Sequence, residues 1–181
     1  MDDESKSKLK TRIVKTLLTL VLLYGGVCLV LSFMQRDLMY YPHRFRPGPA
    51  LYRALDMLLV SVQVENGLTL QGWYKPPATP DKPVIVHYHG NAGNIGSRAT
   101  YLRPYMDHGY GLLLAEYRGF GGNGGKKSEE GFYRDAEAWL QWVLKDENIP
   151  PSHVFLYGES LGTGIATQTA LAHPDLGGLV L

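Results

Sequence analysis

The sequence is poor in cysteine and carries almost no net charge. Cys28 is the single cysteine of 181 residues, so no disulfide can form within one chain. The formal net charge of +1 argues against a nucleic-acid partner, because such partners are bound by strongly basic surfaces. Histidine, cysteine and carboxylate residues do not gather at metal-ligand spacing, so we expect no metal and no cofactor.

Long apolar stretches are scarce as well. Residues 16–34 form one such stretch, which contains no charged residue. As a helix its nineteen residues, at about 1.5 Å each, would span about 28 Å, close to the hydrocarbon thickness of a bilayer. A cleaved signal peptide would end at a small-x-small site, whereas residues 29–34 continue apolar. A lipidated Cys28 would follow a small residue rather than Val27, and a buried core helix would show a polar face. We therefore predict an uncleaved, single-pass membrane anchor.

The residues around this anchor indicate its orientation. Five Lys/Arg precede it within residues 1–15, and three arginines follow it within residues 36–46. The positive-inside rule favours a cytoplasmic amino terminus and a domain on the outer, periplasmic or lumenal side. Tyr40 and Tyr41 would suit the headgroup layer. The expected parts are a basic cytoplasmic tail at 1–15, a transmembrane anchor at 16–34, a stiff proline-containing linker at 35–53 and a folded domain at 54–181.

After the linker, the chain has the pattern of a β-hairpin followed by alternating strands and helices. Asn66-Gly67, the strongest two-residue turn signal, lies between β-prone residues. Ser128 is typical of a helix N-cap and is followed by two glutamates. This order predicts an α/β domain with a mostly parallel sheet, an opening antiparallel hairpin and helices on both faces. The expected strands are 57–64, 68–74, 84–88, 111–115, 154–158 and 179–181, with helices at 94–108, after Ser128 and from the serine turn to about 173.

Gly158-Glu-Ser160-Leu-Gly162 follows an apolar strand and precedes an Ala/Thr/Ile-rich segment. Between a strand and a helix, Gly-x-Ser-x-Gly is typical of a nucleophile elbow, where a side chain at either glycine would clash with nearby backbone. The serine hydroxyl is then held above a helix amino terminus, whose dipole favours negative charge. The alternative is a chance occurrence of the pattern in a loop. We predict Ser160 as a nucleophile, with Gly158 and Gly162 as the elbow glycines.

The loop His-Gly-Asn-Ala-Gly-Asn at 89–94 is expected at the same sheet edge, because parallel strands end there together. Its glycines would let N–H groups turn inward, as an oxyanion hole requires. Leu161, which follows the serine, would supply a second N–H. The plainer alternative is a strand-to-helix turn capped by Asn94. His87 and His89 could act as bases or metal ligands, but without an accompanying ligand cluster we expect them to shape the loop.

A second loop, residues 116–128, contains a Gly-x-Gly-x-x-Gly pattern at 119–124 that has the spacing of a dinucleotide fingerprint. That fingerprint needs a helix opening within the glycines and an acid about twenty residues on, at the end of a strand. Here the helix begins later, and Glu137 lies within it. A P-loop does not fit either, because Phe120 and Lys127 occupy its first Gly and its Ser/Thr positions. We expect no bound nucleotide.

Together these motifs resemble the α/β-hydrolases, in particular the membrane-anchored abhydrolase-domain serine hydrolases and the serine-aminopeptidase-like branch. The resemblance runs from the anchor to the last residue and implies the α/β-hydrolase fold. It also implies Ser160 as nucleophile and the amides of Asn91 and Leu161 as the oxyanion hole. Glu116 stands where Asp is expected before Tyr-Arg-Gly. The motifs that carry the resemblance are Gln35-Arg-x-Leu-Met-Tyr-Tyr-Pro42, His89-Gly-Asn-Ala-Gly-Asn94, Tyr117-Arg-Gly-Phe-Gly121 and Gly158-Glu-Ser-Leu-Gly162.

After Ser160 the only candidates for a triad acid and base are His173 and Asp175, and they stand in the reverse of the family order. At about 1.5 Å per helical residue, His173 would lie roughly 20 Å from Ser160, far beyond hydrogen-bond reach. The apolar run at 179–181 also has the character of a central strand. We therefore expect a carboxyl-terminally truncated hydrolase whose triad acid and base are missing from this chain.

Two hypotheses for function follow. In the first, the complete protein hydrolyses an ester, thioester or amide in a small-molecule, acyl or peptide substrate, and this short chain is inactive. In the second, the short chain is a non-catalytic, membrane-bound interaction module. The sequence leaves the substrate groups, a lid and the oligomeric state open.

Overall fold

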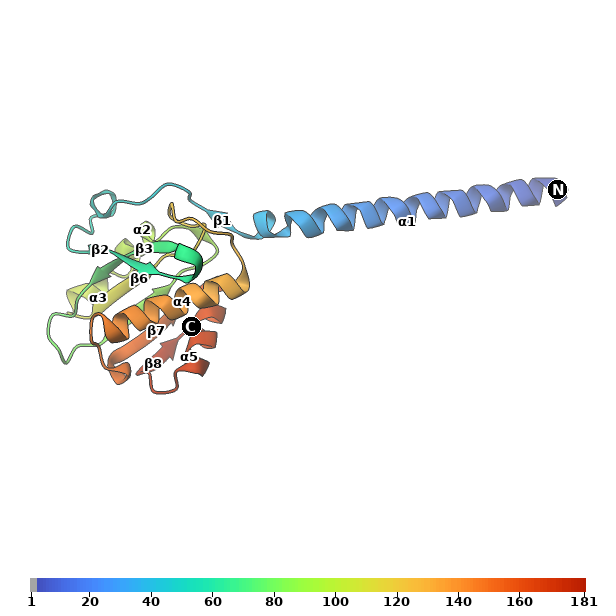
Figure 1. Ribbon diagram of the computed structural model, residues 1–181. Helices are drawn as coiled ribbons and strands as arrows, with labels where there is room; N and C mark the ends of the chain where they lie inside the picture. The colour runs from blue at the N-terminus through green and yellow to red at the C-terminus, as the bar shows by residue number, and fades with distance from the viewer. Residues whose placement is uncertain (1–2) are drawn as a thin grey trace. The chain divides into compact units, whose positions relative to one another are not determined.

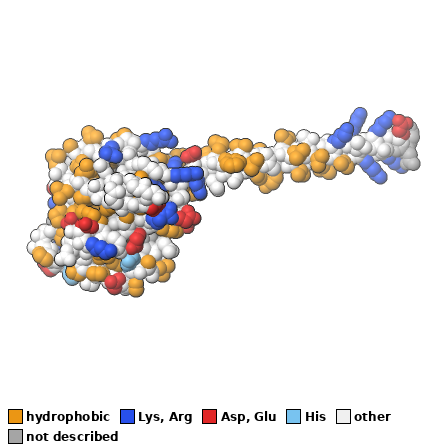
Figure 2. Space-filling model, in the orientation of Figure 1, with side chains coloured by type: hydrophobic (Ala, Val, Ile, Leu, Met, Phe, Trp, Pro, Cys, Tyr) orange, Lys and Arg blue, Asp and Glu red, His pale blue; other side chains and the backbone are white. Residues whose placement is uncertain are grey.

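The computed structural model describes residues 3–181 and divides the chain into two compact units, one ending at Met39 and one running from Tyr40 to Leu181. The first unit is a single helix, α1, at Asp3–Met39 (Figure 1). Within the described part of the chain, α1 is the one helix long and apolar enough to cross a membrane, with a mean hydropathy of 2.4 in its most apolar window. Apolar side chains cover its middle, and basic ones gather near its amino-terminal end (Figure 2).

The helix extends beyond the predicted anchor at both ends. On the amino-terminal side, Lys8 donates to the Glu4 carboxylate at 2.6 Å, an i,i+4 pair that favours helix. On the other side, residues 35–39 continue the helix into the segment predicted as a linker, and Pro42 follows shortly after its end. The compact domain accordingly begins at Tyr40 rather than at residue 54.

The segment after α1 packs onto the domain, so much of the predicted linker belongs to the fold. Tyr41–Pro42 forms a short strand, β1, that pairs in parallel with β5 (Ala92–Gly93). The N–H groups of Tyr41 and His43 donate to carbonyls of residues 91 and 93 at 2.9 Å. Tyr40 is 8% exposed and packs edge-on against Phe132, with 5.2 Å between ring centroids. Its expected place in the headgroup layer is therefore wrong, because the ring belongs to the domain core.

The second unit is built on a six-stranded sheet in the order β2-β3-β6-β4-β7-β8. Strands β6, β4, β7 and β8 run parallel, and the β2–β3 hairpin joins them antiparallel through β3. The predicted mostly parallel sheet with an antiparallel opening is confirmed. The strands are β2 at Leu58–Gln63, β3 at Thr69–Lys75, β4 at Val84–Tyr88, β6 at Gly111–Ala115, β7 at Val154–Gly158 and β8 at Gly178–Val180.

Asn66 and Gly67 make the turn of the β2–β3 hairpin, as predicted. Both have positive φ, 54° and 74°, which a type I′ turn requires. The Leu68 N–H donates to the Glu65 carbonyl at 3.0 Å and closes the turn. The sequence signal was therefore sufficient to place this hairpin.

Helices cover both faces of the sheet, as the strand–helix alternation predicts (Figure 1). Alternate residues of β4 serve the two layers, because successive side chains of a strand point to opposite faces. Val84 and Val86 pack in the cluster that contains α4 and α5, and Ile85 packs in the cluster that contains α2 and α3. The helices are α2 at Gly96–Tyr101, α3 at Arg103–Asp107, α4 at Glu129–Lys145 and α5 at Leu161–Ala172.

The single helix predicted over 94–108 is two short helices instead. α2 and α3 are separated at Leu102, which is buried at the break. Pro104 lies in the first turn of α3, where its missing N–H has no helical partner to lose. The helix expected after Ser128 is confirmed, and the Ser128 hydroxyl accepts the Gly131 N–H at 3.1 Å.

Candidate active site

Ser160 stands at the turn between β7 and α5, at the carboxyl end of a central strand. Its backbone has φ 51° and ψ −112°, a conformation that residues with a side chain rarely adopt. Such a conformation costs on the order of 1–3 kcal/mol and persists only where the surrounding structure enforces it. The residue is exposed. The serine predicted as nucleophile therefore lies on a strained turn that is open to solvent.

The two glycines around Ser160 are required by close backbone contacts. A Cβ on Gly162 would overlap the carbonyl oxygen of Tyr88, at the end of β4. A Cβ on Gly158 would lie 2.6 Å from both the Gly162 carbonyl oxygen and the Cα of Thr163. Real Cβ atoms do not approach backbone that closely, so α5 can begin this near the sheet only with glycine at both positions.

The loop at 89–94 lies beside the serine, as its position after β4 predicts. A Cβ on Gly90 would be 3.4 Å from the Cβ of Ser160 and 3.2 Å from the Oε1 of Glu159. Asn91 follows Gly90 directly in the chain. Leu161 is the first residue of α5, a position whose N–H has no partner within the helix. The structure thus brings Ser160, Leu161 and the start of this loop together.

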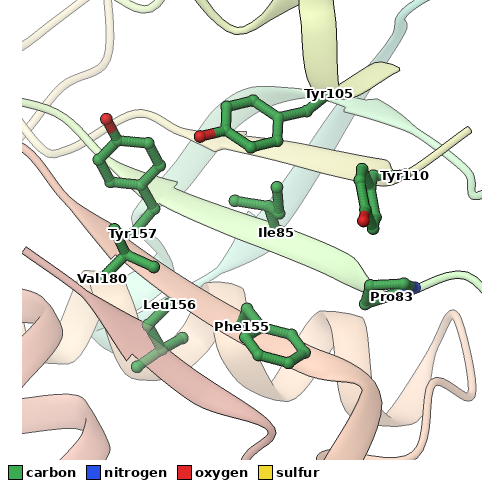
Figure 3. Close-up of a pocket in the computed structure, with 8 residues that line it drawn as sticks. All are labelled: Pro83, Ile85, Tyr105, Tyr110, Phe155, Leu156, Tyr157 and Val180. Carbon is green, nitrogen blue, oxygen red and sulfur yellow. The ribbon is translucent and has the colours of Figure 1, made fainter. Parts of the chain in front are cut away.

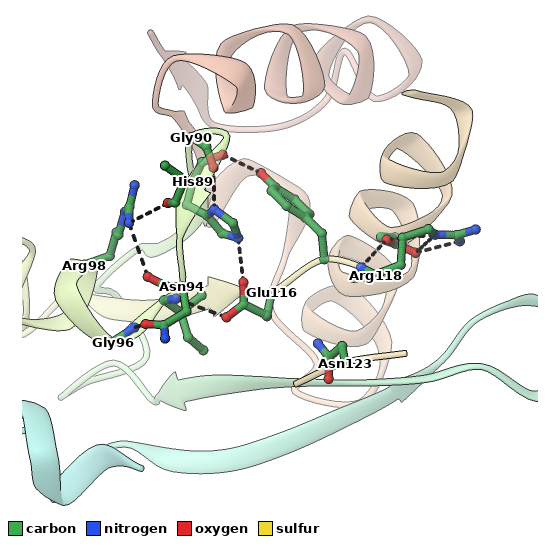
Figure 4. Close-up of polar contacts among 12 residues, drawn as sticks. His89, Gly90, Asn94, Gly96, Arg98, Glu116, Arg118 and Asn123 are labelled. Atoms are coloured by element: carbon green, nitrogen blue, oxygen red, sulfur yellow. Dashed lines mark hydrogen bonds and ion pairs between the residues drawn. The ribbon is translucent and has the colours of Figure 1, made fainter. Parts of the chain in front are cut away.

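His89 holds the base of the loop within a buried polar cluster (Figure 4). Its Nδ1 lies 2.7 Å from the Gly90 carbonyl oxygen, and its Nε2 lies 2.7 Å from the Oε1 of Glu116, an ion-pair distance. The other Glu116 oxygen accepts the Ile95 N–H at 3.1 Å. The Tyr117 ring packs on the imidazole, with 4.3 Å between centroids. These contacts give His89 the loop-shaping role expected of it and make Glu116 the residue that ties two loops together.

His87 is buried beneath the elbow and faces a different carboxylate. Its Nε2 is 3.7 Å from the Oε2 of Glu159, beyond hydrogen-bond range, and neither ring nitrogen has a hydrogen-bond partner among residues 3–181. Burial, with a smaller effect of the neighbouring His89, lowers the pKa of His87 to about 3. The neutral ring packs edge-on against Tyr157, with 5.3 Å between centroids. His87 is therefore a packing residue at neutral pH.

An ion pair that sequence reasoning missed joins α2 to the elbow. Arg98 donates to the Glu159 carboxylate through Nε at 3.0 Å and Nη2 at 2.8 Å. The Arg98 hydrogen bonds hold the pKa of Glu159 below its usual value. The available signal was a charged residue inside an apolar elbow motif, which needs a partner when it is partly buried. The two residues are 61 positions apart, so no local pattern identifies the partner.

His173 is not near Ser160. It lies just past the far end of α5, and its Nε2 is 2.8 Å from the Oε2 of Glu137. The 12 residues of α5, at about 1.5 Å each, separate it from the serine by about 18 Å. Asp175 lies in the turn that follows. As expected, neither residue can act as a triad partner of Ser160.

Two hollows beside β7 differ in their relation to the serine. An apolar hollow of about 220 Å³, with Ile85, Tyr105 and Phe155 among its lining residues, lies on the α3 face and does not include the elbow (Figure 3). A second hollow, of about 430 Å³, is lined by residues of α2 together with Tyr157 and Glu159. Glu159 directly precedes Ser160, so the lining of the second hollow comes within one residue of the candidate nucleophile.

Known proteins resemble this chain in sequence. Residues 79–181 match the family model described as serine aminopeptidase, S33. An uncharacterised protein of Mycobacterium tuberculosis is 32% identical over 91% of this chain and 59% of its own length. The lysophosphatidylserine lipase ABHD12 of Danio rerio is 37% identical over 53% of this chain and 25% of that protein. The chain spans little more than half the length of curated relatives that match about nine tenths of it.

Solved structures share the arrangement of strands and helices. An α/β-hydrolase of Vibrio vulnificus aligns with a TM-score of 0.63 and 26% identity, over 75% of this chain and 51% of that chain. The esterase Pf2001 of Pyrococcus furiosus aligns with a TM-score of 0.58 and 20% identity, over 75% of this chain and 55% of that chain, which shows the fold alone. With a sheet of this topology and a family match over more than half of its residues, the chain belongs to the serine aminopeptidase S33 family of α/β-hydrolases.

Proposed function

We propose that this chain carries the nucleophile of a membrane-anchored serine hydrolase and that the nucleophile is Ser160. The observation that supports this most directly is the backbone of Ser160, held at φ 51° against an energetic cost. The strain serves a purpose if the hydroxyl must project from the carboxyl end of β7 above the amino terminus of α5. A serine that only linked the two elements would have no need of it.

In the proposed reaction the Ser160 hydroxyl attacks a carbonyl carbon while a general base accepts its proton. The negative oxygen that develops is stabilised by the N–H groups of Leu161 and Asn91 and by the dipole at the start of α5. The position of Leu161 supports its part, and the adjacency of the 89–94 loop to Ser160 supports that of Asn91. Gly158 and Gly162 make this arrangement sterically possible.

The general base and the acid that orients it are proposed to lie in sequence outside residues 1–181. His173 is tied to Glu137 at the wrong end of α5. His87 and His89 are buried and face Glu159 and Glu116. The chain also spans only 59% of the length of its relative from Mycobacterium tuberculosis. On this proposal the 181-residue chain by itself lacks hydrolytic activity.

The proposed substrates are carboxylic esters, thioesters or amides of small-molecule, acyl or peptide type. One relative is named a lysophosphatidylserine lipase and one structural neighbour an esterase, which favours an ester. Residues 16–34 within α1 are the proposed membrane anchor, crossing once with the amino terminus in the cytoplasm. The other proposed parts are the cytoplasmic tail at 1–15 and a folded domain that starts at Tyr40, so that most of the segment expected as a linker belongs to the domain.

Ester hydrolysis by the full-length protein in its membrane tests the proposal. We expect Ser160→Ala to lower turnover of p-nitrophenyl esters by at least about a thousandfold. Ser152→Ala is the matched control, because Ser152 is an exposed serine just before β7, at the opposite edge of the sheet. Equal turnover by Ser160→Ala and wild type would exclude the proposed nucleophile. Absence of turnover in the wild type, with a stable fold, would favour the non-catalytic membrane-bound module.

A further inference from the structure

Arg98 makes an unusual number of contacts for a single side chain at the start of a short helix. Its guanidinium binds the Glu159 carboxylate through two nitrogens, at 3.0 and 2.8 Å. Its Nη1 also donates to the backbone carbonyls of Ala92, at 3.1 Å, and Asn94, at 3.3 Å (Figure 4). One planar group therefore binds the 89–94 loop and the residue before Ser160 at the same time.

Both ends of this connection carry parts of the proposed site. Ala92 follows Asn91 directly, and Glu159 precedes Ser160 directly. The two segments also approach each other closely at Gly90, where an added Cβ would lie only 3.2 Å from the Glu159 carboxylate. A shift of either segment would change the distance between the serine and the loop amides, on which stabilisation of an oxyanion depends.

The strength of the pair suits such a role. Bidentate arginine–carboxylate pairs are both stronger and more directional than a lysine–carboxylate contact. The Arg98 side chain is 14% exposed and the Glu159 side chain 39% exposed, so the pair is only partly shielded from water, and its bidentate geometry matters more than its burial. A lysine at this position could satisfy the carboxylate or a carbonyl oxygen, but its point charge could not hold all three groups in one plane.

We propose that Arg98 and Glu159 are positioning residues that fix the 89–94 loop against the nucleophile turn and so set the geometry of the oxyanion hole. The proposal rests on the function proposed above. It assigns no direct contact with substrate to either side chain. Both act through the backbone segments that they join.

The same chain offers a matched control pair. Arg103 binds the Asp56 carboxylate through two nitrogens, at 2.8 and 2.9 Å, and donates to the Arg53 carbonyl at 2.8 Å. This pair has the same chemistry as Arg98 with Glu159, but it connects α3 to the segment before β2 and touches no residue of the proposed site. Asp56 also accepts from Lys75 at 2.6 Å, so the control variant is compared with Arg98→Gln by its kcat and not by its loss of stability.

The experiment uses the full-length protein and measures kcat, KM and the inhibition constant of a trifluoromethyl ketone, which binds as an oxyanion adduct. We expect Arg98→Gln and Glu159→Gln each to lower kcat about a hundredfold with KM within threefold, because misplacement by about 1 Å costs that much. Affinity for the ketone should fall in parallel. The double variant should be no worse than either single one, since both changes break the same link. Arg98→Lys, the variant least disturbing to folding, should lose about tenfold.

Arg103→Gln should keep kcat within twofold even where its melting temperature falls. The proposal is overturned if Arg98→Gln changes only the melting temperature, as the control does, or if Arg98→Lys retains wild-type kcat and ketone affinity. It is also overturned if Glu159→Gln raises KM alone, because Glu159 would then contact substrate. These outcomes require a wild type whose activity depends on Ser160. An active Ser160→Ala variant refutes the proposed function instead, whatever the Arg98 variants do.

Discussion

Replacing Ser160 by glycine should make the protein more stable although it removes the proposed nucleophile. The backbone at φ 51° and ψ −112° is accessible to glycine without steric conflict, whereas for a residue with a Cβ it costs on the order of 1–3 kcal/mol. Glycine also gives the unfolded chain more freedom, which returns roughly 0.5–1 kcal/mol of that gain. The net expectation is a stabilisation of about 1 kcal/mol.

Thermal unfolding of the full-length protein measures this effect. For a domain of this size, about 1 kcal/mol corresponds to an increase in Tm of roughly 3 °C. Ser160→Ala is the essential control, because alanine removes the hydroxyl but keeps the Cβ that causes the strain. We expect its Tm to stay close to that of the wild type. A glycine variant that melts at or below the temperature of the alanine variant would refute strain at this turn, and with it the main support for Ser160 as nucleophile.

Two further predictions concern the residues packed around the elbow. Gly162→Ala should destabilise the domain by about 3 kcal/mol, because the new Cβ would overlap the Tyr88 carbonyl. Gly164→Ala, on the same helix, is the control: its new Cβ would meet no atom within 4 Å, so the variant should be neutral or stabilised by up to about 1 kcal/mol. Equal denaturation midpoints for the two variants would contradict the close approach of α5 to β4. His87 has a pKa of 6.5 in the unfolded chain and of about 3 in the folded state, so the unfolded chain binds more protons between these values. The contribution of His87 to the free energy of unfolding is therefore complete above pH 6.5 and falls by about 1.4 kcal/mol per pH unit as the pH drops toward 3. Urea unfolding of His87→Leu between pH 7 and 4 should show a correspondingly flatter pH dependence, and an unchanged slope would show that His87 is not buried as a neutral ring.

Much of the fold is predictable from the sequence because its signals are local. Strands β4, β6 and β7 are continuous apolar runs that end at glycine, proline or polar residues, and the predicted and observed bounds coincide. The Asn66-Gly67 turn and the Ser128 cap depend on the conformation of a few neighbouring residues, so sequence alone was enough for both.

What the sequence could not predict depends on contacts between distant segments. β1 is two residues long, and its existence depends on pairing with β5, about fifty residues away. The burial of Tyr40 follows from that pairing rather than from any property of its neighbours. For the same reason no local pattern pairs Arg98 with Glu159, which lies 61 positions away. The break at Leu102 is different, because Pro104 in the first turn of α3 is a local signal that the expectation of a single helix overlooked.

The proposed site divides along the same line. The positions of Ser160, Gly158 and Gly162 can be predicted from one motif, because close backbone contacts require glycine on both sides of the serine. The position of the 89–94 loop can be predicted because parallel strands end at one edge of a sheet. The base and the acid do not follow, because His89 and His173 are bound to Glu116 and Glu137, and His87 is a buried ring that packs beside Glu159.

The most direct test of the account is the site at which a fluorophosphonate attaches to the full-length protein. The reagent forms a phosphonyl ester with an activated serine, and mass spectrometry of the peptide that contains residues 158–163 locates the adduct. The account predicts modification of Ser160 in the wild type and in Ser152→Ala, and none in Ser160→Ala. An adduct on another residue, or undiminished labelling of Ser160→Ala, would contradict it.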